Sequence, residues 1–183
     1  MGGWNSNRGD SGLRLGGVVA KNAEQGLGLI ECLQTSDLFT GLGDELLARI
    51  GALCQMESYK AGAVIFAEGD AADKLYILNE GIVTIRIQPA PGGKNFVVQP
   101  IEKKAGVFGW SGLANPSVYT ASAVCATDAR VIAIDGDKLM ALLEEFPSAG
   151  LVVMKRLVAI VGARLRRTRE YLKEDVHLAS YHF

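Results

Sequence analysis

The chain has 183 residues, of which 49% are hydrophobic and 21% are charged, and its formal net charge is −1. This composition excludes a disordered chain, the length suits one domain with tails, and the near-zero charge gives no overall attraction to nucleic acid. The chain has neither a signal peptide nor an apolar run of the about 18 residues that a membrane span needs, so we expect a cytoplasmic protein with no membrane contact.

The N-terminal part is predicted to be a tail followed by two helices. Residues 1–28 are rich in glycine and show no apolar period, so we expect them to be disordered. A short helix is expected from about residue 29 to residue 34. In the next helix, apolar residues recur at helical spacing from Leu46 to Leu53, and Asp44 is the expected N-cap.

Between Glu57 and Ile134 the chain changes to short apolar and β-branched runs separated by glycines. Short strands at this spacing, with turn residues between them, predict an all-β barrel or jelly roll. The predicted strands span residues 64–66, 75–78, 82–85, 96–98 and 131–134, and the predicted turn residues are Gly62, Gly69, Asp70 and Gly81. Residues 89–93, Pro-Ala-Pro-Gly-Gly, are expected to form a hairpin tip.

Two helices are predicted after the strands. The first is capped by Asp137 and ends at Pro147, and the second spans residues 148–174. Apolar residues of the second helix alternate at the spacings of a coiled-coil seam: Leu151, Met154, Val158, Val161, Leu165 and Leu172. We therefore expect a homodimer through this helix, while a helix that packs on its own domain is the alternative. The basic cluster from Arg164 to Arg169 is expected on a solvated face.

The stretch from Gly62 to Ile85, GAVIFAEGDAADKLYILNEGIVTI, combines several glycines, an acidic turn and alternating strands in one register. It resembles the β-roll signature of the cyclic-nucleotide-binding superfamily, which includes catabolite activator protein, Fnr-like regulators and the regulatory subunits of protein kinase A. The resemblance covers roughly residues 38–172. It implies a mainly β fold, a double-stranded β-helix or jelly roll with N-terminal helices. The β-roll with its flanking helices would occupy residues 29–147, followed by a long dimerisation helix, 148–174, and a tail, 175–183.

In that family the ligand lies in a phosphate-binding cassette, which corresponds here to residues 106–122. The resemblance implies these ligand-binding residues: Gly109, Trp110, Ser111, Gly112, Leu113, Tyr119, Thr120 and Ala121. Trp110 stands where the family has a glutamate that holds the ribose 2′-hydroxyl, and Tyr119 stands where it has an arginine that pairs with the cyclic phosphate. The loss of two charge-assisted hydrogen bonds predicts that cAMP or cGMP binds about two to four decades more weakly.

Trp110 and Tyr119 allow two interpretations. In one, the two rings fill the volume that a nucleotide occupies in the family. In the other, they line a remodelled pocket, in which the hydroxyls of Ser111, Thr120 and Ser122 hold an anionic or polar group of a different ligand.

Full-strength nucleotide binding would require another cation at the cassette. Lys103, Lys104 and Arg130 are the candidates near it in the sequence. By resemblance, the adenine-facing positions of the last helix fall near Ile160 and Val161, and both are apolar. Purine contact through hydroxyls on this helix is therefore not expected.

No catalytic or metal-binding constellation is visible in the sequence. His177 and His182 lie in the terminal segment after the predicted helix and show no framework for nucleophilic or metal chemistry, so we expect neither an enzyme nor a metal site. Cys32, Cys54 and Cys125 form no CxxC pair and are predicted to be buried free thiols.

Three functions are consistent with these patterns. The first is a sensor module that binds a cyclic nucleotide or another small ligand and signals to a downstream protein through its last helix. The second is a ligand-free protein-interaction module with a filled pocket. The third is a transcription-regulator-like protein without a DNA-binding domain of its own, because catabolite activator relatives carry a helix-turn-helix after the long helix and this chain ends about ten residues past it.

Overall fold

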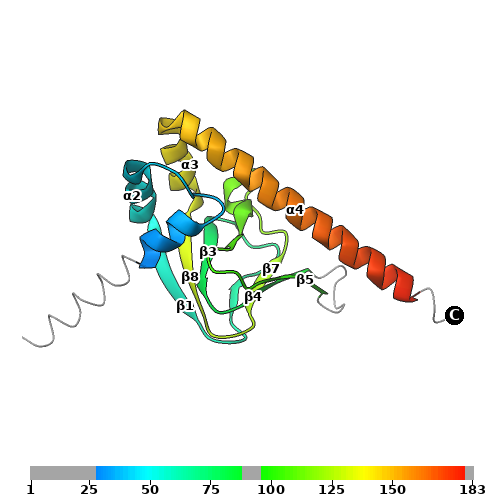
Figure 1. The fold of residues 1–183 in the computed structure, drawn as a ribbon. Coiled ribbons are helices and arrows are strands. Elements are labelled where there is room, and N and C mark those ends of the chain that lie inside the picture. Colours follow the sequence, from blue (N-terminus) through cyan, green and yellow to red (C-terminus); the bar gives the residue numbers. More distant parts are fainter. Residues whose placement is uncertain (1–27, 88–95, 180–183) are drawn as a thin grey trace, which may run out of the picture.

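The computed structural model describes residues 28–87 and 96–179, which form two four-stranded antiparallel sheets with helices along one side (Figure 1). The strands are β1 (Cys54–Tyr59), β2 (Val64–Phe66), β3 (Lys74–Glu80), β4 (Val83–Ile87), β5 (Phe96–Ile101), β6 (Val107–Phe108), β7 (Ser122–Cys125) and β8 (Ala129–Asp135). One sheet has the order β1-β8-β3-β6 and the other the order β2-β7-β4-β5. This arrangement confirms the predicted jelly roll and adds β1, β6 and β7, which the sequence did not predict.

The sheet that contains β3 and β8 is covered on both faces, and its side chains alternate between two hydrophobic cores. The inner core, between the two sheets, receives Tyr76, Leu78, Val131 and Ala133. The helix-side core, between this sheet and the helices, receives Leu75, Ile77, Ile132 and Ile134. Because successive side chains of a strand point to opposite faces, a continuous apolar run can serve two cores at once.

The helices all lie on the outer side of that sheet. Residues 28–35 are helical, and they are followed by α2 (Asp44–Ala52), the 3-10 helix η1 (Trp110–Leu113), α3 (Gly136–Glu145) and α4 (Pro147–Ala179). The predicted caps were wrong by one or two residues. Gly43 occupies the N-cap position of α2, and the carboxylate of Asp135 caps α3 by accepting a hydrogen bond from the Lys138 N–H at 3.0 Å. Asp44 and Asp137 lie instead in the first turns, where a negative charge interacts favourably with the positive end of the helix dipole.

The predicted turn residues are confirmed. The backbone angle φ is 84° at Gly62, 91° at Gly69 and 87° at Gly81. Asp70 closes its turn by accepting a hydrogen bond from the Ala67 N–H at 2.9 Å. Two features exclude a side chain at Gly81. Its φ is positive, and an added Cβ would lie 2.3 Å from the carbonyl oxygen of Asp128.

Helix α4 packs one face on the domain and leaves an apolar stripe in solvent. It continues through residues 175–179, past the predicted end at 174, and is about 50 Å long at 1.5 Å per residue. Val153 is fully buried, and Leu157, Ile160 and Met154 pack against the helix-side core. On another face, Leu151, Val158 and Leu165 are 56%, 71% and 52% exposed, and we call these three residues the α4 stripe. Val161 is half-buried.

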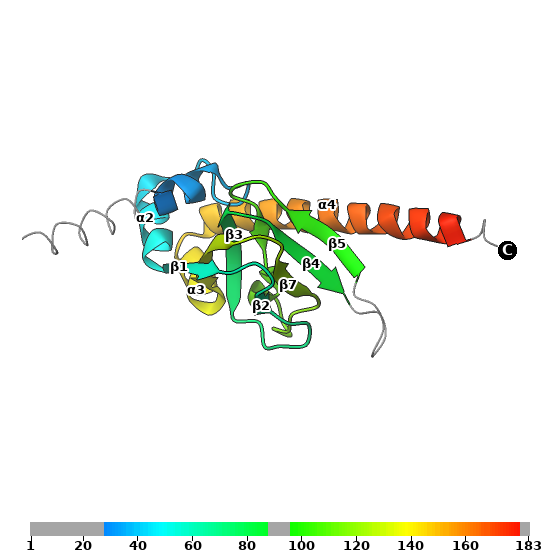
Figure 2. The same ribbon diagram turned by 90° about the horizontal axis from the view of Figure 1, so that it is seen from below.

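Figure 2 shows that the C-terminal end of α4 extends past the strands. The helix therefore packs on its own domain, as the alternative interpretation predicted, and also displays an apolar stripe, while the homodimer stays a prediction. Among the described helices, none has the length and hydropathy that crossing a membrane would require.

Some predictions fall outside the described residues. These are the tail up to residue 27, the hairpin tip at 89–93 and His182, while the described helical backbone gives no account of the side chains of Leu172 and His177. Residue 28 belongs to the first helix rather than to the predicted tail.

The three cysteines are free thiols. Cys32 and Cys125 are buried as predicted, whereas Cys54 is half-buried. Burial raises the pKa of all three thiols, and that of Cys54 reaches about 12. Because the thiolate is the reactive form, these cysteines are expected to be unreactive near neutral pH.

Candidate functional site

The cassette is held against β3 by close backbone packing. It begins at β6, turns at Gly109 with φ 73°, and continues into η1. A Cβ at Gly109 would lie 2.8 Å from the ring of Tyr76, and one at Gly112 would lie 2.7 Å from the carbonyl oxygen of Lys74. The sequence places glycine at these two positions because a larger residue would push the cassette away from the sheet.

Tyr119 belongs to the inner core. It is 4% exposed, and its ring stacks on that of Phe66 with centroids 3.8 Å apart and an interplanar angle of 11°. Its hydroxyl donates a hydrogen bond to the carbonyl oxygen of Lys74 at 3.0 Å. Burial raises the pKa of Tyr119, so the phenol is neutral. The position predicted to correspond to the family's phosphate-binding arginine is thus a neutral core aromatic.

Trp110 has a different environment from Tyr119. It is half-buried and packs against the helix-side core rather than the inner core. The guanidinium carbon of Arg164 lies 4.4 Å from the centroid of its ring, which is the geometry of a cation–π contact. Of the two aromatic residues, only Tyr119 therefore acts as a plug, and Trp110 links the cassette to α4.

Arg164 is the cation at the cassette, and the sequence analysis assigned it to a solvated face. Its Nη2 donates a hydrogen bond to the carbonyl oxygen of Val107 at 3.0 Å. Burial, together with the neighbouring Arg167, lowers the pKa of Arg164 to about 10, so it still carries its charge at neutral pH. Arg166, Arg167 and Arg169 are exposed as predicted. The available signal was the spacing, since Arg164 follows Ile160 by four residues and so lies on the face of α4 that packs on the domain.

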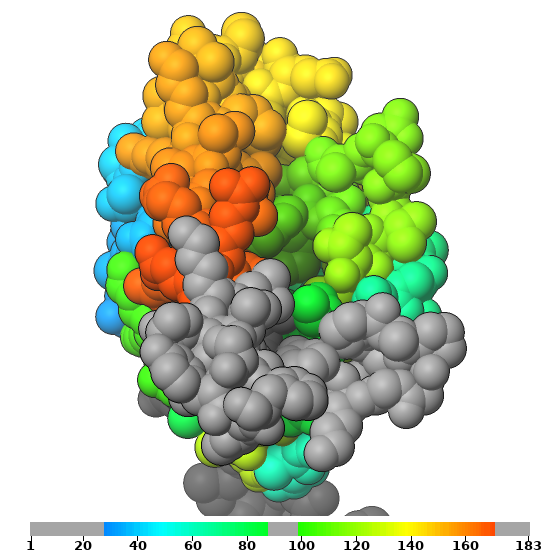
Figure 3. Space-filling model, turned by 90° about the vertical axis from the view of Figure 1, so that its right-hand side faces the viewer, coloured from blue at the N-terminus to red at the C-terminus, as the bar shows by residue number. Residues whose placement is uncertain are grey.

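The residues that line the predicted ligand position enclose only about 50 Å³. We call this hollow the cassette pocket; it is lined by Phe66, Ile85, Gly109, Trp110, Ser111, Tyr119, Thr120, Ala121 and Arg164. One water molecule takes up about 30 Å³ in the liquid, so the pocket in this conformation is far too small for a nucleotide. In Figure 3 it lies between α4, in orange, and the yellow-green cassette segment.

Three predicted residues lie elsewhere. Gly112 is buried against the backbone of β3, and Leu113 packs against the helix-side core. The hydroxyl of Ser122 accepts a hydrogen bond from the N–H of Glu68 at 2.9 Å and therefore stabilises a turn, not a ligand. Sequence adjacency did not separate these residues from their pocket-lining neighbours, because the side chains of consecutive residues point in different directions.

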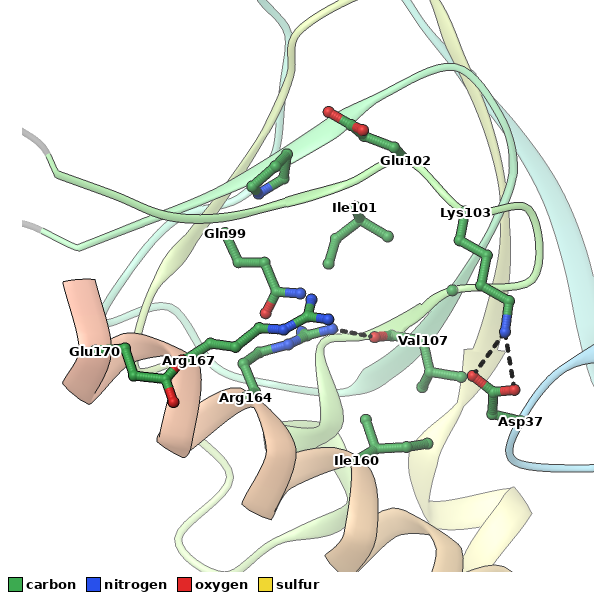
Figure 4. Close-up of a pocket in the computed structure, with 12 residues that line it drawn as sticks. Asp37, Gln99, Ile101, Glu102, Lys103, Val107, Ile160, Arg164, Arg167 and Glu170 are labelled. Carbon is green, nitrogen blue, oxygen red and sulfur yellow. Dashed lines mark hydrogen bonds and ion pairs between the residues drawn. The ribbon is translucent and has the colours of Figure 1, made fainter.

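A much larger hollow, of about 800 Å³, lies on another side of Arg164 (Figure 4). We call it the α4 cleft; it is lined by Asp37, Gln99, Pro100, Ile101, Glu102, Lys103, Gly106, Val107, Ile160, Arg164, Arg167 and Glu170. It lies between α4 on one side and β5 with the β5–β6 link on the other. Among the residues that the structure describes, Arg164 alone lines both hollows.

The cations proposed from the sequence do not reach the cassette pocket. Lys103 lines the α4 cleft, where its Nζ lies 3.0 Å from Oδ1 of Asp37. Arg130 pairs with Glu80 at 2.9 Å, and Lys104 lies 3.5 Å from Glu31. Ile160 also lines the α4 cleft, and Val161 lines neither hollow. Within residues 28–87 and 96–179, no group of three His, Cys, Asp or Glu side chains could hold a metal ion.

Comparisons with known proteins identify the family of this domain. The chain matches the family model of the cyclic nucleotide-binding domain over residues 56–146. It is 28% identical over 144 residues to the CRP-like cAMP-activated global transcriptional regulator of Mycobacterium tuberculosis, a match that covers 79% of this chain and 62% of that protein. It is 29% identical over 123 residues to the cAMP-dependent protein kinase regulatory subunit of Dictyostelium discoideum, covering 64% of this chain and 36% of the subunit.

A solved structure shows the same likeness in three dimensions. The chain superposes on a protein of Geobacter metallireducens, described as a cyclic nucleotide-binding protein, with a TM-score of 0.64 and 33% sequence identity. That match covers 74% of this chain and 96% of the other one. The chain spans less than two thirds of the length of the Mycobacterium and Dictyostelium relatives. It belongs to the cyclic nucleotide-binding domain family.

Proposed function

We propose that this domain is a non-catalytic sensor that binds a small ligand between the β-roll and α4, and that α4 transmits the binding event. The observation that carries the proposal is the position of Arg164, which projects from α4 and contacts the cassette at both Val107 and Trp110. A ligand that pairs with this guanidinium must compete with those two contacts. Its binding energy is therefore coupled to the position of α4.

The size of the cassette pocket supports a conformational step. A cyclic nucleotide does not fit into about 50 Å³, so its binding would require Arg164, or the whole of α4, to move outward. A ligand shifts such an equilibrium only by its differential affinity for the two conformations. Weak binding of cAMP or cGMP is the expected result, because part of the contact energy is used to open the pocket.

A thermal-unfolding titration with cAMP and with cGMP, up to millimolar concentration, tests the proposal. We expect a saturable rise of the melting temperature, because a ligand that binds only the folded chain stabilises it by RT ln(1 + [L]/Kd). The Arg164→Gln variant should lose this rise. The matched control is Arg166→Gln, which removes an exposed arginine from the same helix and should keep it. A melting temperature that neither nucleotide changes would favour the ligand-free interaction module.

We also propose that α4 pairs with the α4 of a second copy. The α4 stripe supports this proposal, because its three apolar residues recur every seven residues and are more than half exposed. A seven-residue apolar repeat is the seam of a left-handed coiled coil. Burying such a stripe against its own copy would remove apolar surface from water on both chains.

The dimer is tested by charge substitution rather than by truncation, because α4 contains the fully buried Val153 and its removal would damage the core. The double variant Val158→Asp with Leu165→Asp places charges on the stripe and should be a monomer in light scattering. Ala159→Asp, at an exposed position that is not part of the stripe, is the matched control and should remain a dimer. A wild-type chain that is monomeric at micromolar concentration would rule out the seam.

A further inference from the structure

The α4 cleft has the volume and the polar groups of a ligand site, whereas the cassette pocket does not. At about 800 Å³ it lies within the range of known small-molecule sites, about 300–1,000 Å³. A ligand of nucleotide size could occupy it without first opening the domain. Figure 4 shows the side chains of Gln99, Arg164 and Arg167 converging in its middle.

The charges in the cleft are separated into distinct regions. Asp37 is neutralised by Lys103, whose Nζ lies 3.0 Å and 3.1 Å from its two carboxylate oxygens. The carboxylates of Glu102 and Glu170 lie at the edges of the cleft in Figure 4, and that of Glu102 points away from the arginines. The middle of the cleft is therefore positive.

The two arginines have unused hydrogen-bonding capacity. Arg167 forms no hydrogen bond or ion pair with any described residue, and Arg164 uses one of its five N–H donors on Val107. Two adjacent guanidinium groups form a geometry suited to phosphate oxygens, which they bind in pairs. Gln99 indicates a second feature of the ligand. Its Oε1 is buried and accepts no hydrogen bond from any described residue. A ligand N–H or O–H donor would satisfy it.

We propose that the α4 cleft binds an organic phosphate of nucleoside-monophosphate size, with the phosphate between Arg164 and Arg167 and a hydroxyl or amino group donating to Gln99. This inference rests on the proposed function, in which Arg164 senses the ligand. The ligand's charge would then be held by α4 and not by the cassette, where Tyr119 has replaced the family's arginine.

The proposed site remains open in the proposed dimer. At 100° per residue, Arg167 lies about 200° around the helix from Leu165, and Ile160 lies about 200° from Val158. Arg167 and Ile160 therefore lie on the side of α4 opposite the stripe, and Arg164 lies about 100° around the helix from Leu165. A second copy on the stripe would leave the cleft accessible.

Isothermal titration calorimetry at constant ionic strength tests this proposal with three probes that differ in charge: AMP, cAMP and adenosine. We expect AMP to bind most tightly and adenosine at least tenfold more weakly, because adenosine lacks the phosphate. The Arg167→Gln variant should weaken AMP binding at least tenfold. Arg166→Gln, the neighbouring exposed arginine that does not line the cleft, should change it less than twofold.

Each outcome decides a separate point. Equal affinity for AMP and adenosine, or equal effects of the two arginine variants, would overturn the phosphate site. A cAMP response that disappears in Arg164→Gln but persists in Arg167→Gln would also overturn it, while leaving the proposed function intact. If none of the three probes binds at millimolar concentration to the folded chain, both the phosphate site and nucleotide sensing are wrong.

Discussion

The cassette pocket and the α4 cleft share Arg164 but are built from different kinds of residue. The cassette pocket is closed by the stacked rings of Phe66 and Tyr119, which are part of the inner core. The α4 cleft is lined largely by charged and polar side chains that no core requires. The comparison shows that core aromatic rings close one hollow, while the other is an open cleft with polar side chains.

Substitutions in the two hollows are expected to differ most in their effect on the free energy of unfolding, and the largest effect is expected for Tyr119→Ala. Removing a buried aromatic ring should lower the free energy of unfolding by about 3–5 kcal/mol in urea denaturation. Tyr119→Phe keeps the ring and removes only the hydroxyl bond to Lys74, so it should cost about 1 kcal/mol. The matched cleft variant, Arg167→Gln, should change stability by less than about 0.5 kcal/mol. A small loss in Tyr119→Ala would mean that the ring is not structural.

A smaller effect is expected at the boundary between the hollows, where Arg164 stacks on Trp110. A double-mutant cycle with Trp110→Ala and Arg164→Ala should give a coupling free energy of about 0.5–2 kcal/mol. The same cycle with Arg166→Ala in place of Arg164→Ala should give a coupling near zero. If the two cycles agree, the stacking does not link the cassette to α4, and the route proposed for the signal is wrong.

The strands that the sequence predicted are those that contain an uninterrupted apolar or β-branched run of three or four residues. β3 and β8 were visible because both of their faces are buried, so residues 75–78 and 131–134 form continuous apolar runs. β1, with the sequence CQMESY, was missed because its polar residues do not alternate cleanly with apolar ones. β6 has two residues and is too short for any periodic signal.

The site was predicted less completely than the fold. Resemblance predicted the cassette and its substitutions at Trp110, which follows Gly109, and at Tyr119, which precedes Thr120. It did not locate Arg164 or Gln99, because their roles depend on how α4 and β5 lie against the cassette. Within its cluster of four basic residues, Arg164 is distinguished from its solvated neighbours by its spacing from Ile160, but the sequence analysis did not use that spacing.

The short strand β6 anchors the start of the cassette in both hydrophobic cores. Val107 contributes to the helix-side core and Phe108 to the inner core, and both residues pair with β3. The backbone from which the cassette starts is thus anchored before any ligand arrives. In the proposed site, recognition depends instead on surface side chains such as those of Arg164 and Arg167. A domain built in this way can acquire a new specificity through a few substitutions while its scaffold stays the same.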